Sequence, residues 1–312
     1  MTEQPPRPSG GEPGRPARPG IIPLAPQDAG DLVGAGFRFV RTCPVTVLVP
    51  ILVYSAVLVA VQFGLQGETG GVGPTSVPGY GADPFGPFSL WSGLGIAAVT
   101  ALIYPPLLGI ALAALRPAVV GRRIGPGQAW QAARPHLGAL YVVVPVTALI
   151  GLVPVLIIGF VGAPLWESGV VGAVVAVLLV VAGYVVMIYL TVLLTLAPAA
   201  VVVEGLPAVD ALHRSRELVT GSWWRCFGVQ LLCGIAVAVA GLAIAIPVIA
   251  VAVAVGAGGL RSGAVVVGGI GIVLYEALAY AVLVGTTALL YQDQRIRREG
   301  LDPELASAAH GG

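Results

Sequence analysis

The chain has 312 residues, of which 57% are hydrophobic and only 10% are charged, and its formal net charge is +1. Soluble domains contain about 45–50% apolar and about 25% charged residues, so this composition excludes an ordinary soluble protein. The small net charge argues against nucleic acid as a partner, because a nucleic-acid-binding face needs many basic residues.

The N-terminal segment is rich in Pro and Gly and contains too few apolar residues to form a core. We expect residues 1–27 to be a disordered cytoplasmic tail. No apolar stretch of a cleavable signal peptide occurs in residues 1–20. The first apolar segment is therefore expected to act as the insertion signal and to remain in the protein.

Six apolar segments follow, and each is long enough to cross a bilayer. Two uncharged stretches of 35 residues would each reach about 52 Å as a helix, against a hydrocarbon core of ~30 Å. We expect these two to tilt, protrude or break, with Pro198 and Pro247 as the breaking points. The predicted spans are 44–65, 93–115, 137–161, 169–203, 226–260 and 263–291.

The 16 basic residues are all Arg, and they alternate strictly between the segments. Five precede the first span, four follow the second, three follow the fourth and three follow the sixth, whereas the opposite loops hold only Arg261. Arg-rich short loops stay on the cytoplasmic side. This pattern predicts an all-α, multi-pass protein of the plasma membrane. Its six-span membrane domain covers 28–291, both termini are cytoplasmic, and residues 292–312 form a C-terminal tail.

An Arg-bearing amphipathic segment precedes the first, third and fifth spans. In the first of these, Leu32, Phe37 and Val40 share one helical face, and Arg38 and Arg41 lie on the other. The recurrence predicts three repeats, each a cytoplasmic interfacial amphipathic helix followed by a transmembrane hairpin. The three segments are 28–41, 128–137 and 207–219. In the second, Trp130, Ala133 and Leu137 align; in the third, Val209, Leu212 and Val219 align.

The third amphipathic segment also contains two charge pairs in the order that favours a helix. Asp210 precedes Arg214, and His213 precedes Glu217, each by four residues. Gly221 then suits the end of this helix.

Arg side chains in these segments and after the last span are candidates for contact with anionic phospholipid headgroups. Each Arg near an anionic leaflet contributes about 1 kcal/mol of attraction. The candidates are Arg38, Arg41, Arg134, Arg214, Arg216, Arg295, Arg297 and Arg298.

Glu276 is the only acidic or basic residue well inside a predicted span. An ionised carboxylate at the bilayer centre costs at least about 2.5–3.5 kcal/mol, so we expect Glu276 to be buried against the bundle, protonated or paired. As a functional site it would have Tyr275, Tyr280 or a polar Thr as its neighbours. A neutral carboxyl that bonds between helices is the structural interpretation, and a proton or cation site is the functional one.

The sequence contains no catalytic motif that withstands inspection. There is no G-x-S-x-G, no H-E-x-x-H and no phosphate-binding loop, and we predict no catalytic residue, metal site or cofactor. Cys43, Cys226 and Cys233 lie in or beside apolar segments and are expected to be small buried hydrophobic residues.

Three stretches carry a resemblance to a known bacterial family. Together with the six-span layout, they resemble the membrane domain associated with glycerophosphoryl diester phosphodiesterases, in its stand-alone actinobacterial form. This resemblance implies no activity, since the stand-alone members have none assigned. The stretches are IIPLAPQDAGDLVGAGFRFVRTCP (21–44), LAPAAVVVEGLPAVDALHRSRELVTGSWWRCFGV (196–229) and ALLYQDQRIRREGLDPELA (288–306).

The phosphodiesterases themselves need a soluble barrel with an HRG motif and metal-binding carboxylates. Here the sequence reads HRS at 213–215, and the loops have roughly 10–30 residues against about 250 for such a barrel. We therefore expect a non-enzymatic membrane protein that organises lipids or partner proteins at the inner leaflet. The alternative is a transporter or channel that uses Glu276 as a proton or cation site.

Overall fold

The computed structural model describes residues 28–67, 87–119, 124–157, 165 and 168–299. The predicted N-terminal tail and most of the loop after the first span lie outside the described residues. Every element in the described ranges is a helix, and these ranges contain no strand. The elements are α1 (Ala29–Thr42), α2 (Pro44–Gly67), α3 (Pro87–Val119), α4 (Pro126–Ala133), η1 (Arg134–His136), α5 (Leu137–Ile157), α7 (Val170–Leu194), α8 (Ala197–Glu204), α9 (Ala208–Val219), α10 (Trp223–Ala257) and α11 (Arg261–Glu299).

Six long helices, α2, α3, α5, α7, α10 and α11, are long and apolar enough to cross a membrane. The two most apolar spans are among the least buried. Val170–Glu204 and Trp223–Ala257 have mean hydropathies of 2.8 and 2.7, yet only 17% and 11% of these spans is buried within the molecule. Such helices need an apolar solvent. The prediction of a six-span helical membrane bundle is confirmed.

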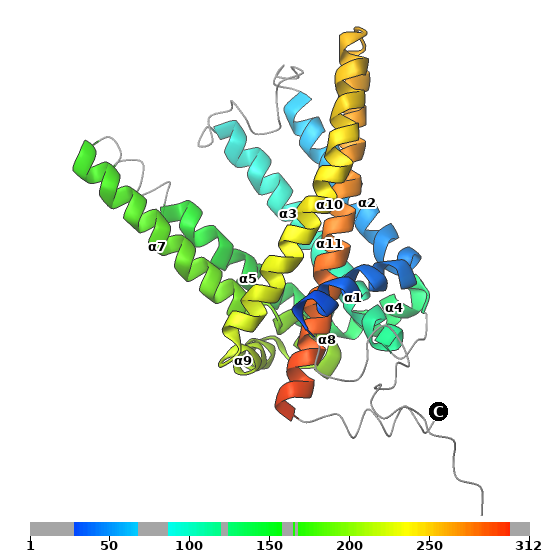
Figure 1. The fold of residues 1–312 in the computed structure, drawn as a ribbon, viewed down its shortest axis with the longest axis vertical. Coiled ribbons are helices and arrows are strands. Elements are labelled where there is room, and N and C mark those ends of the chain that lie inside the picture. The colour runs from blue at the N-terminus through cyan, green and yellow to red at the C-terminus, as the bar shows by residue number, and fades with distance from the viewer. Residues whose placement is uncertain (1–27, 68–86, 120–123, 158–164, 166–167, 300–312) are drawn as a thin grey trace, which may run out of the picture.

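The predicted threefold order is also present. A short helix precedes each hairpin of long helices: α1 precedes α2 and α3, α4 precedes α5 and α7, and α9 precedes α10 and α11. The short helices gather at one end of the molecule, and the long helices diverge from one another towards the other end (Figure 1). We call the end where the short helices gather the short-helix end. It comprises α1, α4, η1, α8 and α9. The last helix continues to Glu299, past the predicted end of the span at Tyr291.

The two predicted breaking points behave differently. The break near Pro198 is confirmed, because α7 ends at Leu194 and Pro198 lies in the first turn of α8. A proline there lacks only an N–H that has no helical acceptor. The predicted break at Pro247 is wrong, because α10 runs through it without interruption. Pro247 is exposed on the surface of α10, and loss of one backbone hydrogen bond does not end a membrane helix.

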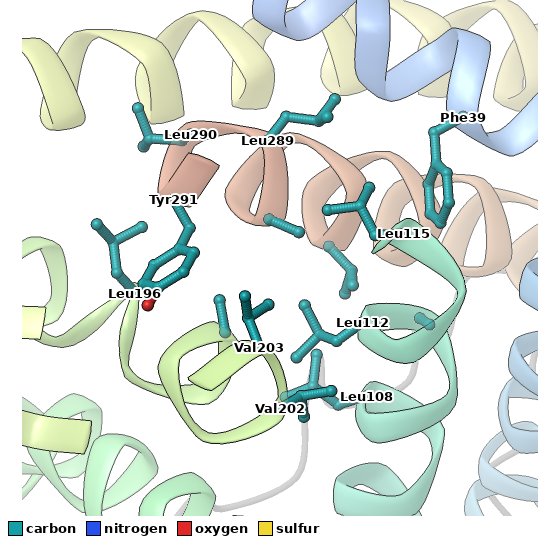
Figure 2. Packing of buried hydrophobic residues seen from close by; sticks show 14 of the residues in the cluster. Phe39, Leu108, Leu112, Leu115, Leu196, Val202, Val203, Leu289, Leu290 and Tyr291 are labelled. Atoms are coloured by element: carbon teal, nitrogen blue, oxygen red, sulfur yellow. The ribbon is translucent and has the colours of Figure 1, made fainter. Parts of the chain in front are cut away.

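The buried core lies next to the short-helix end. Figure 2 shows side chains of α3, α8 and α11 converging there, with Phe39 of α1 at one side. Tyr291 of α11 lies against Leu196, at the start of α8. The labelled core residues are Phe39, Leu108, Leu112, Leu115, Leu196, Val202, Val203, Leu289, Leu290 and Tyr291.

The apolar face of α1 packs on α11 instead of facing lipid. Leu32 and Phe39 are fully buried, whereas Phe37, which the sequence placed on this face, is half-buried. Gly36 makes the approach possible: a Cβ at this position would lie far inside van der Waals contact with the Thr286 hydroxyl and at 3.2 Å from the Val282 carbonyl oxygen. The buried face of α1 is therefore rotated from the predicted one towards Gly36, the small residue that lets the backbones of α1 and α11 approach each other.

The other two amphipathic helices show the same rotation. In α4 the buried residues are Ala129 and Ala133, while Trp130 is exposed. In α9 Ala211 and Leu218 are buried, and Val209, predicted on the apolar face, is 63% exposed. Small side chains again face the bundle, because they allow closer helix packing than bulky ones.

Candidate functional site

Glu204 ends α8 and joins three helices at the short-helix end. Arg214 of α9 donates to its carboxylate from Nε and Nη2 at 3.2–3.3 Å. Arg295 of α11 approaches it with Nε at 3.2 Å, and the Tyr291 hydroxyl also donates to it. A negative charge at a helix C-terminus is unfavourable, and these two guanidinium groups offset it. The predicted pair of Asp210 with Arg214 is absent, since Arg214 turns to Glu204 and, at 3.9 Å, to Glu217.

Asp293 of α11, which lies between Tyr291 and Arg295 in the chain, forms a second carboxylate centre. Its side chain is only 1% exposed. Arg225 of α10 donates to it at 2.8 Å, and Arg297 of α11 donates at 3.0 Å. Hydrogen bonds between ionised partners are roughly twice as strong as neutral ones, so this centre fixes α10 against the end of α11.

Ser215 closes the gap between α7 and α8. Its hydroxyl is fully buried, accepts a hydrogen bond from the Leu196 N–H at 3.2 Å and donates to the Leu193 carbonyl oxygen at 2.8 Å. These are backbone groups that the helix break leaves without helical partners. A side chain of α9 thus stabilises the break near Pro198.

Arg298 caps the C-terminus of α9. Its guanidinium donates to the Glu217 carbonyl oxygen at 2.8 Å and also to the Thr220 carbonyl oxygen. Gly221 follows with φ at 88°, the left-handed conformation that ends many helices. The predicted role of Gly221 is confirmed.

The contacts divide the eight predicted headgroup residues into two sets. One set makes ion pairs or hydrogen bonds inside the protein: Arg214, Arg295, Arg297 and Arg298. The other set is exposed and makes no side-chain hydrogen bond or ion pair to a described residue: Arg38, Arg41, Arg134 and Arg216. The exposed set lies on α1, η1 and α9, all at the short-helix end (Figure 1). Headgroup contact by any of the eight stays a prediction.

An open groove of about 440 Å³ lies between α9 and the end of α11. It is lined by His213, Arg216, Glu217, Thr220 and Arg298. Arg216 is the one member of the exposed set that borders this groove.

Glu276 is half-buried on α11 and faces Ser55 of α2. One of its carboxyl oxygens and the Ser55 hydroxyl are buried without a hydrogen-bond partner among the described residues. Tyr280 is a neighbour, as expected, but Tyr275 instead packs on Gly241 of α10. The prediction that Glu276 lies against the bundle is therefore confirmed only in part, because the residue stays partly exposed.

Tyr54 and Tyr280 lie near Glu276, and Tyr104 contacts both of these tyrosines. The rings of Tyr54, Tyr104 and Tyr280 contact one another with centroids 5.7–6.2 Å apart, and the Tyr54 hydroxyl donates to Thr100 at 3.3 Å. The cavity they border measures about 10 Å³. That volume holds at most about one water molecule.

Sequence reasoning missed Glu204 and Asp293 as centres of the charged network. Glu204 ends an apolar stretch and Asp293 is surrounded by Arg, so each looked like an ordinary residue at a membrane boundary. One partner of each lies far away in the chain: Tyr291 is 87 residues from Glu204, and Arg225 is 68 residues from Asp293.

The remaining candidate residues are the three cysteines and the side chains that could bind a metal ion. Cys43, Cys226 and Cys233 are buried and not disulfide-bonded, as predicted. Within the described ranges no three His, Cys, Asp or Glu side chains group together in a way that could hold a metal ion.

Six apolar spans whose charged network gathers at one end define a multi-pass helical membrane protein. Residues 28–294 match the family described as a domain of unknown function (DUF7847), and the chain belongs to this family. No curated protein and no solved structure matches it. The resemblance to the phosphodiesterase-associated membrane domain stays a prediction.

We expect Asp293→Asn to lower the free energy of unfolding by about 2 kcal/mol, because the neutral amide loses the ionic hydrogen bonds to Arg225 and Arg297. Glu217→Gln is the matched control, since the Glu217 side chain is 72% exposed and its pair with Arg214 is long. Thermal unfolding of the detergent-solubilised protein checks this. Equal stability of the two variants would show that the Asp293 centre contributes nothing.

Proposed function

We propose that the protein is a non-enzymatic, multi-pass protein of the plasma membrane that organises anionic phospholipids, or a partner bound with them, at the cytoplasmic leaflet. The observation that carries this proposal is the exposed set of Arg side chains. Three short helices present them at the same end of the molecule, while the other predicted headgroup residues make contacts inside the protein.

The aromatic residues beside the network support headgroup depth at this end. Trp223 of α10 stacks on Tyr189 of α7 with ring centroids 5.8 Å apart, and Trp224, which contacts Trp223, is 78% exposed. Trp and Tyr concentrate at membrane–water interfaces. Arg-rich segments favour the cytoplasmic side, so the short-helix end is assigned to the inner leaflet.

The packing of the short helices supports headgroups over acyl chains as the ligand. Leu32 and Phe39 of α1 and Leu218 of α9 are buried in the protein, so the exposed faces of these helices are mainly polar, with Val209 as the exposed apolar exception. Anionic headgroups can approach Arg38, Arg41 and the other exposed cations from outside without disturbing the network. Four such contacts at about 1 kcal/mol each give a measurable preference.

When nanodiscs are formed from mixed lipids around the protein and then purified, we expect them to be enriched in phosphatidylglycerol relative to phosphatidylcholine. Replacing the exposed set together (Arg38→Gln, Arg41→Gln, Arg134→Gln and Arg216→Gln) should abolish most of this preference without loss of folded yield. Lipid composition of the purified discs, measured by mass spectrometry, checks the result. An unchanged preference in the fourfold variant, or none in the wild type, contradicts the proposal.

A second candidate function is proton or cation transport through Glu276. The observation that favours it is the partnerless carboxyl oxygen beside the partnerless Ser55 hydroxyl. The size of the adjacent cavity, about 10 Å³, and its apolar walls at Ile51, Leu107 and Leu108 argue against a continuous aqueous path. We therefore rank this candidate second.

We expect Glu276→Gln to preserve folded yield and to leave proton and cation flux in proteoliposomes at the level of protein-free vesicles, as in the wild type. The amide keeps the shape and most of the hydrogen-bonding capacity of a neutral carboxyl. Glu276→Leu removes both and should lower the yield, or leave it unchanged if packing improves. Flux through the wild type that Glu276→Gln abolishes would establish the second candidate instead.

A further inference from the structure

The groove between α9 and α11 is lined by residues of both elements. His213, Arg216, Glu217 and Thr220 are spaced by three, four and seven residues, which places them on one face of α9. Arg298 borders the groove from α11. Basic groups therefore approach a volume of about 440 Å³ from two sides.

Arg298 is held in place before any ligand arrives. Its two hydrogen bonds to carbonyl oxygens of α9, one of them 2.8 Å to Glu217, fix the guanidinium. A guanidinium has five N–H donors, so further donors of Arg298 are available to a ligand. Arg216 makes no side-chain hydrogen bond or ion pair to a described residue and is exposed at the same groove.

We propose that this groove binds the phosphate of an anionic phospholipid headgroup, with Arg298 as the fixed donor and Arg216 as the donor that closes on the ligand. This inference rests on the proposed function and names one site within it. Guanidinium groups recognise phosphate oxygens through paired N–H donors. Trp224, four residues after Thr220 and 78% exposed, supports headgroup depth for the groove.

The charges in the groove favour a phosphate with one negative charge. Arg216 and Arg298 contribute two positive charges, and Glu217 contributes one negative charge next to them. A doubly charged phosphomonoester would place its second charge beside the Glu217 carboxylate, whereas a phosphodiester would not. A headgroup hydroxyl can in addition donate to Glu217. Phosphatidylglycerol has both features, whereas inorganic phosphate is not a diester and shares with it only the phosphate oxygens that the guanidinium groups recognise.

The test measures phosphatidylglycerol binding to the full-length protein in phosphatidylcholine nanodiscs, with Arg216→Gln as the variant and Arg41→Gln as its matched control. Both side chains are exposed, at the same end, and without partners among the described residues. We expect about a fivefold loss of affinity for Arg41→Gln, which removes one surface attraction of about 1 kcal/mol, and about a twentyfold loss for Arg216→Gln, which also removes charge-assisted hydrogen bonds to the phosphate oxygens. Helical content by circular dichroism should be unchanged in both. Arg298→Gln should lower the affinity as well.

Four outcomes overturn the inference in distinguishable ways. Equal losses in Arg216→Gln and Arg41→Gln would mean diffuse attraction, so the groove would fail while the proposed function stood. If the wild type showed no preference for phosphatidylglycerol, both the groove site and the proposed function would be wrong. Tighter binding of phosphatidic acid than of phosphatidylglycerol would contradict the assigned charge. Inorganic phosphate that binds lipid-free protein with the same dependence on Arg216 would make the ligand a soluble anion instead of a lipid.

Discussion

Lipid tails solvate Val and Leu about as well as a neighbouring helix does, so burial of apolar side chains alone cannot hold membrane helices together. The constraint is severe here, because Trp223–Ala257 is only 11% buried and has a mean hydropathy of 2.7. Cohesion must come from polar contacts and close packing. In the described part of the chain these concentrate at the short-helix end, where Glu204 and Asp293 join α8, α9, α10 and α11.

The same contacts determine which cations remain for other ligands. Arg214 and Arg295 offset the Glu204 charge, and Arg225 and Arg297 offset the Asp293 charge. These pairs are partly buried and lock the end of α11 in position. The exposed set of Arg side chains lies on the outer faces of α1, η1 and α9, because the inner faces of α1 and α9 are occupied by packing.

Most of the fold could be predicted because its signals are local. Span positions follow from hydropathy, and the three short helices follow from amphipathic spacing beside each Arg-rich segment. Helix faces were less predictable, since the choice of Phe39 over Phe37 depends on Gly36 meeting Thr286 of a distant helix. Only the local part of the network, the i,i+4 pair of Asp293 with Arg297, could be predicted from spacing. A carboxylate such as Asp293 has the same local sequence context whether it pairs with Arg225 or faces water.

The central claim is that the short-helix end faces the cytoplasm, and thiol labelling of intact cells tests it most directly. Asp210→Cys places an exposed thiol on α9, and Leu260→Cys places one at the turn between α10 and α11, where Leu260 is 65% exposed. The native cysteines are buried and give a low background. A membrane-impermeant reagent should label Leu260→Cys in intact cells and Asp210→Cys only after permeabilisation. Labelling of Asp210→Cys in intact cells, with Leu260→Cys protected, would contradict the account.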